Sequence, residues 1–174
     1  MAFEIHSDIT NRSMTIASRA MRKVLRRKRN IIWAIYGWSV FFINTLLLIP
    51  FDGEVFTLDA STAILLLVEV MLLSALLFQD RINGMIACKN TLAGTKEYHV
   101  VFGEESYTVV TEVATSTFRY ELIDAMAESQ DYMILLMKKR YAQPLDKRTL
   151  TGGTVEECKR FLEEKTGKTF RRVK

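Results

Sequence analysis

The residue types that most often carry out chemistry in proteins are few and scattered in this sequence. His6 and His99 are far apart, and neither has an Asp, Ser or Cys at a spacing typical of acid–base or nucleophilic catalysis. The two cysteines, Cys88 and Cys158, lack the further Cys or His residues of a zinc site, so we expect free thiols. The sequence therefore predicts a protein that is not an enzyme and that has no cofactor or metal ion.

Glu69 is the ionisable residue whose position needs a specific explanation. It lies in the middle of an apolar run, where an ionised side chain is costly and by default suggests a functional site. Asn44 and Ser39 lie on the preceding apolar run, each about one helical turn from the matching depth. We predict that a protonated Glu69 forms a hydrogen bond with one of these two side chains and so holds the two runs together. Two alternatives remain open, a contact with a second copy of the chain and a pathway for a proton or ligand.

The two apolar runs that carry these residues are predicted to cross a membrane. The sequence contains no Lys or Arg between Asn30 and Asp80. Residues 31–51 are long enough to span a hydrocarbon layer of about 30 Å as a helix. Residues 52–59 form a short acidic loop, and residues 60–79 return across the bilayer. Because so short a loop cannot join distant positions, we expect an antiparallel transmembrane hairpin.

The segment before the hairpin, residues 1–30, is predicted to be basic and amphipathic. Basic residues crowd before the first span and are absent from the loop between the spans, a distribution that places both termini in the cytoplasm. The net charge of +4 therefore reflects membrane topology rather than nucleic-acid binding. Either this cluster is simply the cytoplasmic flank of a spanning helix, or it binds anionic lipid head groups. The candidate lipid contacts are Arg19, Arg22, Lys23, Arg26, Arg27, Lys28 and Arg29.

The C-terminal half has the pattern of a small soluble domain. Residues 80–95 are predicted to continue the second span as a helical neck, and residues 96–174 to form an antiparallel meander with a closing helix. Thr154 and Glu157 have the spacing of a capping box, and Gly167 follows the last turn. The expected strands are residues 97–102, 107–112, 116–122, 132–137 and 141–145. The basic tail of Lys168, Arg171, Arg172 and Lys174 is expected to be free in solvent.

Four features of this half resemble the YcxB-like family of small bacterial membrane proteins. They are the turn at residues 102–105, an aromatic strand leading into Leu122, Ile123 and Asp124, the strand at residues 132–137, and a basic turn before the closing helix. The resemblance implies a reduced pleckstrin-homology-like (PH-like) fold held at the inner membrane surface. Such domains bind lipid head groups, peptides or proteins, so the fold alone does not select a function.

The fold class predicted is thus an α+β membrane protein, a two-helix transmembrane hairpin with a small antiparallel-sheet cytoplasmic domain capped by a C-terminal helix. We predict an interaction protein in the bacterial inner membrane, which presents this domain to a partner protein or a lipid head group. The alternative is an immunity or stress-protection protein that acts against a membrane-active toxin or bacteriocin. A homo-oligomer also remains open, and nucleic acid is not an expected partner.

Overall fold

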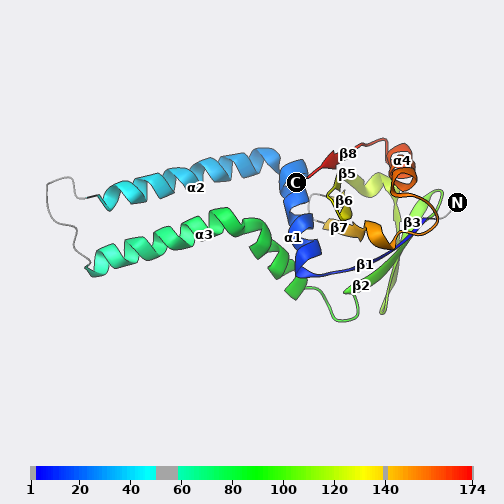
Figure 1. Cartoon of the computed structure of the whole chain (residues 1–174), viewed down its shortest axis with the longest axis horizontal. Helices are drawn as coiled ribbons and strands as arrows, with labels where there is room; N and C mark the ends of the chain where they lie inside the picture. Colours follow the sequence, from blue (N-terminus) through cyan, green and yellow to red (C-terminus); the bar gives the residue numbers. More distant parts are fainter. Residues whose placement is uncertain (1–2, 50–58, 139–140, 174) are drawn as a thin grey trace.

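The computed structural model describes residues 3–49, 59–138 and 141–173. Two long helices project side by side from one end of a sheet domain, and both termini of the chain lie on the domain (Figure 1). Apart from Asp59, the predicted loop at residues 52–59 lies outside the described residues.

The long helices are α2 (Arg27–Leu47) and α3 (Ala60–Lys89). Both are long and apolar enough to cross a membrane, and most of their large apolar side chains are exposed, which excludes the core of a soluble protein. At 1.5 Å per residue, the 30 residues of α3 extend about 45 Å, more than the roughly 30 Å of a hydrocarbon layer. The helix therefore continues past its span and ends at Lys89, within the neck predicted at residues 80–95.

The domain contains two four-stranded sheets with the strand orders β1-β2-β3-β4 and β7-β6-β5-β8. Neighbouring strands are antiparallel except β5 and β8, which are parallel. With the helix α4 (Val155–Thr166), the layout is the predicted α+β class. The strands are β1 (Phe3–Asp8), β2 (Glu97–Phe102), β3 (Ser106–Thr111), β4 (Thr115–Arg119), β5 (Ile123–Glu128), β6 (Tyr132–Met137), β7 (Tyr141–Asp146) and β8 (Phe170–Arg172).

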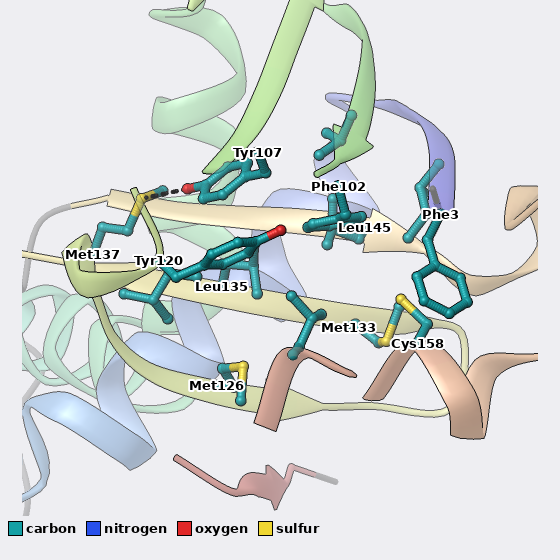
Figure 2. Close-up of a cluster of buried hydrophobic side chains, with 14 of the residues drawn as sticks. Phe3, Phe102, Tyr107, Tyr120, Met126, Met133, Leu135, Met137, Leu145 and Cys158 are labelled. Carbon is teal, nitrogen blue, oxygen red and sulfur yellow. Dashed lines mark hydrogen bonds between the residues drawn. The ribbon is translucent and has the colours of Figure 1, made fainter. Parts of the chain in front are cut away.

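A hydrophobic core lies between the two sheets and α4 (Figure 2). The helix begins with the predicted capping box, in which the Thr154 hydroxyl accepts from the Glu157 amide and the Glu157 carboxylate accepts from the Thr154 amide. It ends at Gly167, whose φ of +66° is the left-handed conformation that glycine adopts most easily. Cys158 and Leu162 are fully buried on its inner face, as the apolar stripe of this helix predicts.

β6 is buried on both of its faces, which explains why its sequence YMILLM is apolar without alternation. Met133 and Leu135 point into the core between the sheets. Ile134 and Leu136 face the other way, into a second apolar cluster that contains Ala17. The helix α1 (Asn11–Ala20) thus covers the second face of this sheet, and its apolar side packs inside the protein.

The N-terminal strand β1 belongs to the same folded unit as residues 96–174. It pairs along its whole length with β2, and its other edge forms two backbone hydrogen bonds between Glu4 and Thr151. The hydroxyl of Ser7 accepts from the Asp146 amide at 2.8 Å and links β1 to the second sheet. The domain therefore needs residues from both ends of the chain.

Two strands, β5 and β8, were not predicted from the sequence. β5, IDAMAE, has few residues with high strand propensity, yet its pairing with β6 buries Met126 and Ala127 completely. β8 lies in the tail that was expected to be free, and this expectation was wrong. The described part of the tail pairs with β5 and includes the buried Val173, because apolar contacts outweigh the tendency of its basic residues to remain solvated; Lys174 lies outside the described residues.

The pairing of β1 predicts that residues 96–174 do not fold alone. Without β1 and α1, the edge of β2 and one face of β6 are exposed to water, so cooperative thermal unfolding should be lost. A soluble chimera in which residues 1–26 are joined to residues 90–174 by a flexible glycine–serine linker should restore it. Circular dichroism of both proteins checks this, and cooperative unfolding of residues 96–174 alone would contradict it.

Candidate functional site

The polar contact in the hairpin connects Glu69 of α3 with two neighbouring residues of α2. The Asn44 Nδ2 donates to Glu69 Oε2 at 2.8 Å, and it also lies 3.4 Å from the Leu65 carbonyl oxygen. The Thr45 hydroxyl is hydrogen-bonded to the other Glu69 oxygen and lies 2.9 Å from the Phe41 carbonyl oxygen. The Thr45 hydroxyl has a single hydrogen and cannot donate to Phe41 and Glu69 at the same time. If Glu69 is protonated, it can donate to the Thr45 oxygen while the Thr45 hydroxyl donates to the Phe41 carbonyl.

Of the two predicted partners of Glu69, the structure brings Asn44 into contact, and Ser39 lies exposed elsewhere on α2. Sequence reasoning missed Thr45. The signal was present, because Thr45 is about one helical turn from the depth of Glu69, but depth alone does not say which side of a helix faces its neighbour. These bonds lie within one chain, so Glu69 needs no second copy to satisfy it.

A second polar contact joins α1 to α3 at the base of the hairpin. Asp80 of α3 accepts from Arg22 Nε at 2.6 Å and from Arg22 Nη2, and Arg19 Nε lies 3.6 Å from the same carboxylate. We call these three residues the Asp80 clasp. Asp80 is almost completely buried, and its hydrogen bonds hold the pKa of Arg22 above the ordinary value. The bidentate geometry fixes the guanidinium and with it the position of the turn that carries Arg22.

The helices α1 and α3 also approach each other closely at Gly84, one helical turn after Asp80 on α3. A side-chain carbon at Gly84 would lie 2.6 Å from the Thr15 backbone nitrogen, so only glycine allows this distance. Further along α3, the Cys88 thiol lies 3.7 Å from the Ile9 carbonyl oxygen. The contact therefore runs along the whole of α1 and attaches the domain directly to the second long helix.

The seven basic residues that were predicted to contact lipid differ in their surroundings, because only some of them bind Asp80. Arg19 and Arg22 are engaged by Asp80. Arg27, Lys28 and Arg29 are exposed on the first turn of α2. Lys23 is exposed and Arg26 half-buried between these two groups, where a five-residue π-helical turn, η1 (Met21–Leu25), joins α1 to α2. The N-terminal end of the basic segment thus packs against α3, and its C-terminal end is exposed to solvent.

The two histidines, which the sequence separates, are neighbours in the fold. His6 and His99 face each other across β1 and β2, with ring centroids 4.1 Å apart. His99 Nε2 lies 3.3 Å from a carboxylate oxygen of Glu4. Within the described parts of the chain, no group of three or more His, Cys, Asp and Glu residues has an arrangement that could hold a metal ion.

Cys88 and Cys158 are both free thiols. Burial on the inner face of α4 raises the pKa of Cys158 to about 12. A thiol with this pKa stays protonated near neutral pH and is a poor nucleophile. Cys158 therefore contributes to the core rather than to covalent chemistry.

The fold and these contacts define an α+β protein with two candidate membrane helices, a layout that fits a membrane protein. Residues 102–162 match the family model described as YcxB-like protein, the family that the sequence of this half resembles. The match extends from the end of β2 to the inner face of α4. No curated protein and no solved structure matches the chain significantly.

The hairpin contact predicts different outcomes for two substitutions at Glu69. Glu69→Gln keeps a donor and an acceptor for Thr45 and Asn44, so thermal stability in detergent should be close to that of the unchanged protein. Glu69→Leu removes the bonds and should destabilise helix association by about 0.6 to 2 kcal/mol without preventing insertion. Ser39→Ala is the matched control on the exposed side of α2 and should have no effect. Equal stability of the Leu and Gln variants would contradict a structural role.

The Asp80 clasp predicts energetic coupling between Arg22 and Asp80. Arg22→Gln and Asp80→Asn should each lower the free energy of unfolding by about 1 to 3 kcal/mol, because each leaves a charged hydrogen-bonding partner unpaired. The double variant should lose less than the sum of the two. Denaturant unfolding in micelles, followed by near-ultraviolet circular dichroism, measures this. Arg81→Gln, on the exposed side of α3, is the control, and strictly additive effects would contradict the clasp.

Proposed function

We propose that this protein is a non-enzymatic, membrane-anchored interaction protein whose domain binds a partner protein or a lipid head group at the cytoplasmic face. The observation that carries the proposal is the direct attachment of the domain to α3 through α1 and the Asp80 clasp. A domain on a flexible linker would sample many orientations beside the membrane. The contacts of α1 and Arg22 with α3 restrict the orientation of this domain, which supports a role in presenting a defined surface.

The orientation across the membrane is supported by charge. The basic residues before α2 lie at the same end of the hairpin as the domain, and such clusters favour the cytoplasmic side. The YcxB-like match and the C-terminal helix packed across the sheets support the PH-like description. Domains of that description bind lipids, peptides or proteins, in agreement with a binding role.

The surface that best suits a protein partner is the edge of the first sheet. β4 is the last strand of that sheet, and four of its five residues are exposed. Val110 and Val113, on and beside the neighbouring strand, are exposed as well. An edge strand has unpaired backbone groups, to which an extended segment of a partner can add as a further strand.

We place the interaction on the domain rather than on the hairpin, the part that an immunity role against a membrane-active toxin would use. The polar groups of the hairpin, Glu69, Asn44 and Thr45, bond to one another. They are therefore already satisfied within the chain and offer little to an incoming membrane peptide.

A photo-crosslinking amino acid at Thr117 of β4 tests the proposal in intact cells. We expect an adduct of discrete mass, because a partner that adds to this edge lies within reach of that side chain. The same group at Glu164, an exposed position of α4, is the matched control and should give no such adduct. The absence of a discrete adduct at Thr117 and along the rest of β4 would contradict a protein partner at this edge.

Cysteine labelling in the same cells controls for topology. In a chain without Cys88 and Cys158, a cysteine at Glu54 should react with an impermeant thiol reagent, and a cysteine at Thr117 should not. The opposite pattern would place the domain outside the cell and would contradict the cytoplasmic assignment.

A further inference from the structure

A pocket of about 280 Å³ lies where the π-helical turn η1 meets α2. It is lined by Arg22, Lys23, Arg27, Asn30 and Ile31. Its volume is near the lower end of small-molecule sites, which suits a head group rather than a whole lipid. Each polar side chain that lines it carries hydrogen-bond donors, and three of the four are cationic.

The π-helical turn creates this arrangement. The Arg26 amide donates to the Met21 carbonyl five residues earlier, at 3.0 Å, so the turn holds one residue more than an α-helical turn. The extra residue changes the direction of the following side chains and brings Arg22 and Arg27 to one depression. Single π turns of this kind occur frequently at functional sites.

Arg22 is held in place before any ligand arrives. Its two hydrogen bonds to Asp80 use two of the five guanidinium N–H donors. The remaining donors belong to a group that is already oriented, so a bound anion need not order it. The segment from Arg19 to Arg29 contains seven basic residues and no acidic residue, which makes the surroundings favourable for an anion.

The pocket lies at the depth where lipid phosphates are expected. Ile31 lines it and also begins the apolar part of α2, so the pocket is basic on one side and apolar on the other. Trp33 and Tyr36, two and five residues further on, are exposed at the same end, as aromatic residues of a membrane interface are. A soluble phosphate would gain nothing from the apolar side.

The C-terminal strand adds positive charge at this end of the domain. Val173, directly after β8, belongs to the same buried cluster as Ala20, which precedes the turn η1, and Met21, which begins it. β8 therefore carries the exposed Arg171 and Arg172 toward the base of the hairpin. The cluster that contains Val173, Ala20 and Met21 thus brings the C-terminal end of β8 near the turn η1.

We propose that this pocket binds the phosphate of an anionic phospholipid head group. Arg22 and Arg27 donate to the phosphate oxygens, and Asn30 donates to an ester or glycerol oxygen. The acyl chains lie along Ile31 and the following turns of α2. The inference rests on the proposed function, since it requires the hairpin to be in a membrane, and it names one ligand of the domain's membrane-facing side.

Native mass spectrometry of the full chain released from micelles, with phosphatidylglycerol or phosphatidylcholine added, tests the proposal. We expect the first phosphatidylglycerol to bind several-fold more tightly than phosphatidylcholine. Lys23→Gln with Arg27→Gln should weaken that binding roughly tenfold. Lys28→Gln with Arg29→Gln is the matched control, because it removes the same charge outside the pocket and should retain most of the binding. An equal loss in both double variants would overturn the site, as would the absence of a preference in the unchanged chain.

Inorganic phosphate in excess distinguishes a lipid from a soluble ligand. We expect no displacement of phosphatidylglycerol, and displacement that depends on Lys23 and Arg27 would overturn the lipid assignment. Each variant should unfold thermally like the unchanged chain. If a double variant fails this control, Asn30→Asp, which adds an acidic group and removes no cation, should weaken phosphatidylglycerol binding by itself.

Failure of this inference and failure of the proposed function give different results. If phosphatidylglycerol shows no preference for the pocket but the Thr117 adduct persists, the lipid site is wrong and the interaction role stands. If neither the adduct nor the lipid preference is found, the proposed function itself is contradicted.

Discussion

The carboxylate of Asp80 connects the part of the protein that fits a membrane with the part that forms sheets. It is nearly buried where α1 crosses α3, and Arg22 binds it through two guanidinium nitrogens. A buried carboxylate without such a partner would destabilise the fold, so α1 must stay where Arg22 can reach. Because α1 also covers one face of β6, this ion pair, together with the close packing of α1 on Gly84, attaches the domain to the hairpin.

The continuous helix α3 carries both polar contacts of the long helices, Glu69 in the candidate span and Asp80 at its end. The two carboxyl groups are stabilised in different ways, because their surroundings differ. In the span no water is available, so the carboxyl group of Glu69 must find donors and acceptors on the neighbouring helix, which Asn44 and Thr45 supply. Near the domain, the Asp80 carboxylate forms an ion pair with Arg22. The basic turn that provides this arginine also lines the pocket for a lipid phosphate.

Local signals in the sequence were sufficient for much of the architecture. The length and composition of the apolar runs predicted the two long helices, and alternation or apolar character predicted β2 and β6 with their observed bounds. The capping box at Thr154 predicted the start of α4. These features depend on a few neighbouring residues and on the solvent around them, and so they can be identified without a tertiary structure. The depth of Glu69 likewise pointed to Asn44.

By itself, then, the sequence determined which segments are apolar helices, which form most strands, and where charge accumulates. Only the tertiary structure decided what those segments contact. β1 and β8 pair with strands that are distant in the chain, and β5 pairs with the adjacent β6 as well as with β8. The tail reaches the turn η1 through the buried Val173. Which side of a helix faces its neighbour, and hence the pairing of Arg22 with Asp80, depends on packing over many residues. Such contacts join residues far apart in sequence, and no local pattern records them.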